Sequence, residues 1–360
     1  MRLITERPDT RPTPAASRDR GGPQQPILIV NGLRKYFPIK GGLLQRKVAE
    51  VKAVDGVDFS VMKGETLGIV GESGCGKSTL ARLLMHLIPK DEGELIFDGD
   101  PVDDIRGLSL RDLRRDLQMV FQDSYSSLNP RLPIQDSIAY GPRVHGVGKA
   151  EAAALAADLL NKVGLRPSMF GARYPHELSG GQRQRVNIAR ALALDPRMLI
   201  LDEAVSALDK SVEAQVLNLL SRLKRELNLT YLFISHDLSV VQYVSDRVLV
   251  MYLGQVVEIG PVDAIYAAPR HPYTRALLDS RLSMNPLERM SEPPLSGDPP
   301  NPVNPPSGCR FRTRCAFAES VCAERQPRLA AADGGAHLVA CHMADAESGH
   351  GRAGLSAPLH

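Results

Sequence analysis

One glycine-rich segment has the residue types and the spacing of a phosphate-binding loop. It reads Gly71-Glu-Ser-Gly-Cys-Gly-Lys-Ser-Thr79, follows the apolar run Leu67–Val70 and opens a helical pattern that continues through Leu80. In such a loop the glycines let backbone N–H groups turn toward the phosphates, and the helix N-terminus adds a partial positive charge. The residues predicted to bind the nucleotide are Gly71, Ser73, Gly74, Cys75, Gly76, Lys77, Ser78 and Thr79.

Two carboxylates follow a second apolar run, Met198–Leu201. Ligand sites in α/β folds lie at the carboxyl ends of buried strands, so Asp202 is the expected Mg²⁺ partner, together with the hydroxyl of Ser78. Lys77 supplies positive charge to the phosphates, and Glu203 is placed to orient or deprotonate the attacking water. Taken alone, Asp202 also fits a helix cap or a turn. Paired with the phosphate loop, the two carboxylates predict hydrolysis of the bound nucleotide.

These residues need a sheet to position them, and the pattern of apolar residues predicts an α/β fold. Short continuous apolar runs are typical of strands buried on both faces of a mainly parallel sheet, with helices between them. The expected strands are Ile27–Val30, Val51–Val61, Leu67–Val70, Glu94–Phe97 and Met198–Leu201.

The chain also divides into segments of different composition. Residues 1–26 are rich in arginine and proline and are expected to form a disordered tail. The stretch at about 124–195 has no convincing strand, and we expect it to be a helical insertion with helices at about 149–163 and 181–194. After Pro261 the pattern expected of a sheet stops.

Eight prolines in residues 286–306 indicate an extended linker or a surface loop. A cysteine-containing segment, 307–342, follows it. We expect residues 343–360, which are polar, to form a flexible tail.

Length and charge exclude several classes of protein. The 360 residues carry a net charge of +3, which argues against a protein that mainly binds nucleic acid. No run of 18 apolar residues is present, and the first 26 residues lack the apolar region of a secretory signal. We therefore expect a cytosolic chain that does not itself cross a membrane.

Three further motifs accompany the phosphate loop and the two carboxylates. They are Leu178-Ser-Gly-Gly-Gln182, Ser206-Ala-Leu-Asp209 and Ile234-Ser-His-Asp237. By itself the first motif also fits an ordinary helix N-cap. In this order and spacing, the five motifs together resemble an ABC-type ATPase subunit over about residues 27–265. The resemblance implies an α/β fold, a P-loop NTPase ABC cassette with an inserted helical subdomain.

The resemblance assigns roles to residues that spacing alone leaves open. Tyr36 is expected to stack on adenine, although it also fits an ordinary aromatic residue at a strand end. Gln122 is expected to reach Mg²⁺ or the water, His236 to contact the γ-phosphate, and Asp209 to communicate across a dimer. Closing over the ATP of a second cassette is the role implied for Ser179, Gly180, Gly181 and Gln182.

Finer resemblance points to the dipeptide and oligopeptide importers. It is carried by Tyr36-Phe-Pro-Ile-Lys-Gly-Gly-Leu-Leu44, by His271-Pro-Tyr-Thr-Arg-Ala-Leu-Leu278 and by the cysteine segment. A small cysteine-containing C-terminal appendage at 266–342 would then follow the cassette. The segment Gln122–Pro130 resembles the surface that importer ATPases offer to a membrane subunit.

This resemblance implies partners and a location. The partners would be a second ABC ATPase subunit (a paralogue or a copy of this chain), two integral membrane permease subunits and an extracytoplasmic substrate-binding protein. The chain would lie at the cytoplasmic face of the inner membrane and use ATP to power peptide import. The alternative is a soluble, non-transport ABC ATPase acting in DNA repair or translation.

Four of the five cysteines crowd together near the C-terminus with the spacing C-x5-C-x6-C-x18-C: Cys309, Cys315, Cys322 and Cys341. Zinc sites usually contain short C-x2–4-C pairs, which are absent here. Longer gaps suit a [4Fe–4S] cluster, which the resemblance also implies. Zinc and metal-free thiols in a small core are the alternatives. Arg310, Arg312 and Arg314 lie between the first two of these cysteines and are interpreted as a solvated basic face, with softening of a cluster's negative charge as the alternative.

Overall fold

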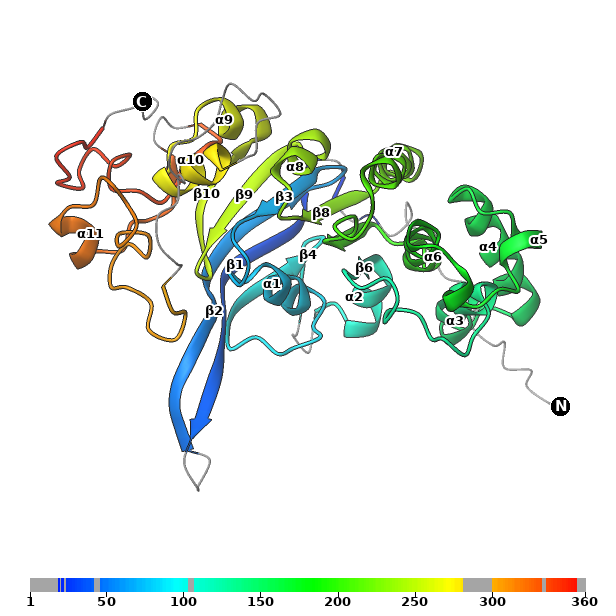
Figure 1. The fold of residues 1–360 in the computed structure, drawn as a ribbon. Coiled ribbons are helices and arrows are strands. Elements are labelled where there is room, and N and C mark those ends of the chain that lie inside the picture. Colours follow the sequence, from blue (N-terminus) through cyan, green and yellow to red (C-terminus); the bar gives the residue numbers. More distant parts are fainter. Residues whose placement is uncertain are drawn as a thin grey trace.

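The structure is a computed structural model that describes residues 19, 21–22, 24–41, 46–102, 107–280, 300–331 and 335–354. Most of the expected N-terminal tail and most of the proline-rich stretch 286–306 lie outside the described residues. Two sheets form the centre of the molecule. A group of helices lies at one side and the C-terminal segment lies at the other (Figure 1).

The first sheet is antiparallel and has the strand order β2-β1-β4-β5. Its strands are β1 (Pro26–Gly41), β2 (Arg46–Met62), β4 (Glu92–Phe97) and β5 (Asp100–Pro101). β1 and β2 form a long hairpin whose far end projects from the body (Figure 1). The expected strands Ile27–Val30 and Val51–Val61 are only the buried part of this hairpin, because its far end is exposed and lacks a continuous apolar pattern.

The second sheet has eight strands in the order β11-β12-β10-β9-β3-β8-β7-β6. β6, β7, β8, β3 and β9 pair in parallel, and β3, β7 and β8 are buried along their whole length. The expected buried strands before the phosphate loop and the carboxylates are thus present. The bounds are β3 (Thr66–Val70), β6 (Leu117–Val120), β7 (Met198–Asp202), β8 (Thr230–Ile234), β9 (Arg247–Tyr252) and β10 (Gln255–Pro261).

The helical insertion contains α3 (Ile134–Val144), α4 (Lys149–Lys162), α5 (Pro167–Phe170), a 3₁₀ turn (Pro175–Glu177) and α6 (Gly180–Leu192). Residues 124–195 hold no strand, and α4 and α6 agree with the two helices expected there. The helices that lie against the sheets are α1 (Lys77–Leu84), α2 (Leu110–Asp116), α7 (Lys210–Leu227) and α8 (Leu238–Val244).

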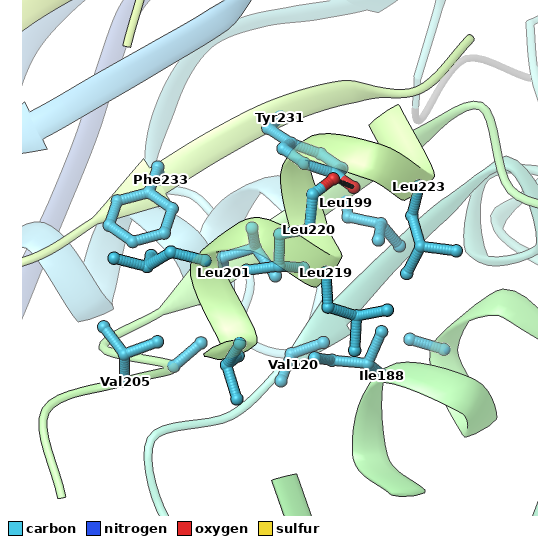
Figure 2. Close-up of a cluster of buried hydrophobic side chains, with 14 of the residues drawn as sticks. Val120, Ile188, Leu199, Leu201, Val205, Leu219, Leu220, Leu223, Tyr231 and Phe233 are labelled. Carbon is cyan, nitrogen blue, oxygen red and sulfur yellow. Dashed lines mark hydrogen bonds between the residues drawn. The ribbon is translucent and has the colours of Figure 1, made fainter. Parts of the chain in front are cut away.

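One of two apolar clusters among the described residues joins the insertion to the central sheet. Figure 2 shows Ile188 from α6 and Leu219, Leu220 and Leu223 from α7 facing side chains of β7 and β8. All of these side chains are buried. Each buried aliphatic side chain contributes about 1.5–3 kcal/mol. The helix that carries the Leu178–Gln182 motif is therefore held against the strands that carry the carboxylates.

The C-terminal region adds α9 (Val262–Ala267), α10 (Pro272–Asp279), α11 (Ser320–Glu324), β11 (Ala330–Ala331) and β12 (Leu338–Val339). The expectation that the sheet stops after Pro261 is wrong, because β12 pairs with β10 and β11 pairs with β12. Strands of two residues are too short to show a period in the sequence. Residues 343–354 fell within the expected flexible tail, yet Met343, Ser348 and His350 are buried.

The core in Figure 2 makes a quantitative prediction. Leu223 is fully buried, so Leu223→Ala should lower the free energy of unfolding by about 2–5 kcal/mol. Leu87 is 46% exposed, and Leu87→Ala should change the free energy of unfolding by less than about 1 kcal/mol. Urea unfolding followed by circular dichroism measures both. Equal losses in the two variants would contradict the assignment of this core.

Candidate functional site

The predicted phosphate loop connects β3 to α1 and so has the strand–loop–helix context that it requires. Gly76 ends the loop at a φ of 110°, and a Cβ atom there would lie 2.2 Å from the carbonyl oxygen of Ala53 in β2. Any larger residue would force β2 away from the loop. Contact with the antiparallel sheet thus sets the shape of the loop. Ser73 and Gly74 lie within it, and Ser78 and Thr79 lie in the first turn of α1.

Lys77 lies inside this loop. It is 6% exposed, and its Nζ donates to the carbonyl oxygens of Gly71 at 2.6 Å and Glu72 at 3.0 Å. The ammonium group is therefore placed where the loop would surround phosphate oxygens. Cys75 is also buried, which raises the pKa of its thiol and leaves it as a neutral packing group.

Ser78 and Asp202, the predicted Mg²⁺ ligands, meet at the junction of α1 and β7. The Ser78 hydroxyl donates to Asp202 Oδ1 at 3.2 Å. Burial raises the pKa of Asp202, the hydrogen bond from Ser78 opposes this shift, and the nearby charge of Glu203 adds to it. A buried carboxylate whose negative charge is partly uncompensated is a suitable ligand for a hard divalent cation.

Two of the three predicted catalytic residues, Gln122 and His236, contact the carboxylate of the third, Glu203. Gln122 Nε2 donates to Glu203 Oε2 at 2.6 Å, and His236 Nδ1 lies 3.4 Å from Glu203 Oε1. Gln122 follows β6, Glu203 follows β7 and His236 follows β8, so each leaves the carboxyl end of an adjacent parallel strand. This is the edge at which α/β proteins bind ligands.

Glu203 has an unusual backbone conformation. Its φ is +49°, in the left-handed region, and its N–H donates to the carbonyl oxygen of Ile234 in β8 at 2.9 Å. A residue other than glycine in this region costs about 1–3 kcal/mol, and such strain is concentrated at functional sites. In this conformation the Glu203 carboxylate contacts Gln122 and His236.

Tyr36, the predicted adenine-stacking residue, lies in β1. Its hydroxyl donates to Asp55 of β2. Partial burial is the main reason that the pKa of Tyr36 rises to about 12, and this hydrogen bond is the second. The Asp55 N–H donates to the carbonyl oxygen of Gly254 at 2.9 Å, and the Gly254 N–H donates to that of Cys75 at 2.8 Å. Two backbone hydrogen bonds thus link the partner of Tyr36 to the phosphate loop.

The motif from Leu178 to Gln182 forms the start of α6. Ser179 Oγ accepts the N–H of Gln182 at 3.3 Å, and Gln182 Oε1 accepts the N–H of Ser179 at 3.0 Å, which makes a capping box. A Cβ on Gly181 would lie 2.3 Å from a methyl group of Val212, so glycine allows α6 to approach α7. Gly180, the remaining predicted residue, is the first residue of α6.

This turn does not meet the phosphate loop of its own chain. Figure 1 shows α6 well separated from α1, the helix that the loop opens. Asp209 lies near Val212 as the N-cap of α7. It accepts the N–H of Val212, which is the main cause of its lowered pKa. The structure therefore brings together the phosphate loop, Asp202 and the group of Gln122, Glu203 and His236. The start of α6 at Ser179 and the N-cap Asp209 lie outside this group.

The four C-terminal cysteines are free thiols that line one pocket, together with Phe311, Arg312 and other side chains. Burial raises the pKa of Cys309 to about 11 and that of Cys341 to about 12. Within the described ranges, no group of three or more histidine, cysteine, aspartate or glutamate side chains could hold a metal ion. The cluster therefore stays a prediction.

The interpretation of the neighbouring arginines as a solvated basic face is wrong for two of them. The side chains of Arg310 and Arg314 are 7% and 6% exposed and pair with Asp55 and Glu72. Sequence reasoning missed these two ion pairs because the partners lie more than 200 positions apart in the chain. The recurrence of arginine at every second position between Cys309 and Cys315 was the one available signal.

Family models match two parts of the chain. One described as ABC transporter matches residues 54–206, and one described as oligopeptide/dipeptide transporter, C-terminal region, matches residues 257–322. Among the described residues, no helix combines the length and the apolarity needed to cross a membrane.

Curated relatives align along most of the chain. The oligopeptide transport ATP-binding protein AppF of Bacillus subtilis is 51% identical over 328 residues, 89% of this chain and 98% of that protein. A protein of Sinorhizobium fredii named as a probable peptide ABC transporter ATP-binding protein is 51% identical over 319 residues, 88% of this chain and 90% of that protein.

Solved structures support the fold. CbiO1 of Clostridium perfringens, part of an ABC transporter complex, has a TM-score of 0.58 at 27% identity and covers 68% of this chain and 92% of its own. The ATP-binding cassette MJ0796, in a dimeric post-hydrolysis state bound to ADP and Pi, has a TM-score of 0.57 at 27% identity and covers 65% of this chain and 98% of its own.

The convergence on Glu203 predicts a separation of ATP binding from ATP hydrolysis. Glu203→Gln keeps the shape of the side chain but removes the proton acceptor, so hydrolysis should fall by about 100-fold or more while ATP still binds. Phosphate release and equilibrium binding of a fluorescent ATP analogue measure the two properties. Glu151→Gln, an exposed change in α4, is the matched control. Hydrolysis by Glu203→Gln at the native rate would show that Glu203 does not act as the base.

Proposed function

This chain belongs to the ATP-binding proteins of ABC transporters, and from that premise we propose that it hydrolyses ATP to power the import of peptides. The observation that carries the proposal is the convergence of Gln122, Glu203 and His236 beside the phosphate loop. The peptide assignment is supported by the match of residues 257–322 to the C-terminal region of peptide transporters and by the names of the relatives.

Each of these polar groups then has a role in ATP binding or in ATP hydrolysis. Lys77 and the loop N–H groups bind the phosphates, and Tyr36 stacks on the adenine. Ser78 and Asp202 would hold Mg²⁺, which supplies charge neutralisation at the phosphates. Glu203 accepts a proton from the attacking water, Gln122 orients that water, and His236 contacts the γ-phosphate.

Two subunits are needed for a complete site. Ser179 is exposed, and the start of α6 lies apart from α1, the helix that the phosphate loop opens, which supports a role across an interface. We propose head-to-tail pairing with a second ABC ATPase subunit, a paralogue or another copy of this chain. Closure of this dimer would exclude water from the phosphates and strengthen the electrostatic interactions there.

The remaining proposed partners are two membrane permease subunits and an extracytoplasmic substrate-binding protein. This arrangement places the chain at the cytoplasmic face of the inner membrane. A groove on α3 supports contact with a membrane subunit. It is lined by Asn129, Leu132, Asp136, Tyr140, Arg143 and Val144. Tyr140 and Val144 are exposed there. It adjoins the segment Gln122–Pro130, which we expect to face a membrane subunit.

Co-purification with the membrane subunits tests this proposal. Tyr140→Ala should reduce the amount of membrane subunit recovered with the chain, and Tyr243→Ala, an equally exposed tyrosine in α8, should leave it unchanged. In the intact complex, peptide-loaded binding protein should stimulate ATP hydrolysis. Recovery of ribosomes or nucleic acid in place of membrane subunits would favour the non-transport alternative.

We also propose that Cys309, Cys315, Cys322 and Cys341 hold a [4Fe–4S] cluster. The support is chemical: all four are free thiols and line the same pocket. A four-iron cluster is larger than a single ion, so its ligands surround it without meeting at one point. Four cysteine thiolates are the usual ligand set of this group, and its expected role is structural.

Anaerobic purification of the full chain tests the cluster. We expect iron and acid-labile sulfide at about four each per chain, with absorbance near 400 nm. Cys322→Ser should lose the absorbance, and Cys75→Ser, the cysteine of the phosphate loop, should keep it. A colourless, iron-free anaerobic sample would rule the cluster out, and zinc found in its place would select the metal alternative.

A further inference from the structure

The segment from Cys309 to Cys315 contacts both the phosphate loop, at Glu72, and Asp55, the hydrogen-bond partner of Tyr36. We propose that Arg314 and Arg310 are positioning residues of this site: Arg314 holds the phosphate loop through Glu72, and Arg310 holds the adenine end through Asp55. This inference rests on the proposed ATP site.

The contact of Arg314 with the loop is bidentate and nearly buried. Its Nη1 and Nη2 donate to the two carboxylate oxygens of Glu72 at 2.9 and 3.1 Å, and Nη1 also lies 3.5 Å from the hydroxyl of Tyr252. Fork-to-fork geometry of this kind fixes orientation as well as distance. The side chains of Arg314 and Glu72 are 6% and 21% exposed, so water screens their interaction only in part.

The charge of Glu72 makes this contact matter for phosphate binding. Glu72 lies in a loop whose task is to bind anions, and an unpaired carboxylate there would repel them. Arg314 neutralises that carboxylate from the side of the C-terminal segment. Sequence inspection of the loop shows the acidic residue but not its counterion.

The backbone of Glu72 is held from the same side. Its N–H donates to the hydroxyl of Tyr273 in α10 at 2.8 Å. The ring of Tyr273 contacts those of Tyr252 and Phe311, with ring centroids 4.6 and 5.4 Å away. Phe311 lies between the two arginines in the sequence, so the same short segment anchors both arginines and this aromatic cluster.

Arg310 makes the second connection. It donates to the carboxylate of Asp55 and to the carbonyl oxygen of Leu253, and Asp55 accepts the hydroxyl of Tyr36. Asp55 is therefore held between the adenine-stacking residue and the C-terminal segment. Neither arginine contacts Gln122, Glu203 or His236 in the described structure, so we expect both to affect ATP binding more than the rate of hydrolysis.

Substitution of Arg314 in the full chain tests the first connection. Arg314→Gln leaves the Glu72 carboxylate unpaired, and the dissociation constant of a fluorescent ATP analogue and the KM for ATP should rise about tenfold or more, with kcat changed less than about threefold. Arg312 donates to Ser307 and makes no ion pair with Glu72 or Asp55, so Arg312→Gln is the matched control and should bind ATP normally.

A double variant separates positioning from general damage to the fold. Glu72→Gln combined with Arg314→Gln removes both charges, and affinity should return to within about threefold of the native value. If the double variant binds as weakly as Arg314→Gln, the charge argument is overturned. Should Arg314→Gln fail to fold, Arg314→Lys keeps the charge but loses the fork: its KM should stay within about threefold of the native value, and a tenfold rise would overturn the charge argument.

Competition with inorganic tripolyphosphate, which has no adenine, distinguishes the two arginines. Arg310→Gln should weaken the binding of ATP but not that of tripolyphosphate. Arg314→Gln should weaken the binding of both ligands. If one of these variants binds both ATP and tripolyphosphate as tightly as the native chain does, the role of that arginine is refuted. If the native chain itself binds no ATP, or if Lys77→Ala binds as well as the native chain, the failure lies in the proposed function and not in this inference.

Discussion

The parallel register of β7 between β6 and β8 is the constraint on which the nucleotide site depends. Val120 pairs with Leu201, and Asp202 pairs with Ile234, so the three strands end at the same level. Gln122, Glu203 and His236 each follow within two residues of these ends. Because adjacent strands lie about 4.8 Å apart, side chains from three neighbouring strands can reach one carboxylate. The buried core that α6 and α7 share with the sheet maintains this register.

The parts of the site that are local in sequence could be predicted, and the parts that depend on distant pairing could not. The phosphate loop is recognisable because the loop, its flanking strand and its helix are contiguous in the sequence. Asp202 is recognisable because it directly follows the apolar run Met198–Leu201. Glu203 and His236 lie 33 positions apart, and only the resemblance to a family joined them before the structure did. The exposed half of the β1–β2 hairpin and the two-residue strand β12 have no periodic pattern to reveal them.

The C-terminal region is built into the cassette at several points. Glu258 of β10 is fully buried, and it accepts the N–H groups of Arg270 and His271 and contacts His337 at 2.7 Å. A buried carboxylate is costly unless such partners surround it, so α10 and the approach to β12 are tied to the central sheet. The ion pairs of Arg310 and Arg314 add to the same join. The sequence suggested an appendage, whereas the structure shows this region in direct contact with the phosphate loop and with Asp55 of β2.

The packing of residues 343–354 bears on where this protein can be cut. Ser348 Oγ donates to the carbonyl oxygen of His342, and a ring nitrogen of His350 lies 2.9 Å from the carbonyl oxygen of Phe317. His350 and Met343 also line the cysteine pocket. A protease that removed the chain after His342 would leave all four cysteines in place and still open that pocket to solvent and oxidants. The resistance of this last stretch to digestion therefore reports directly on how well the thiols beneath it are shielded.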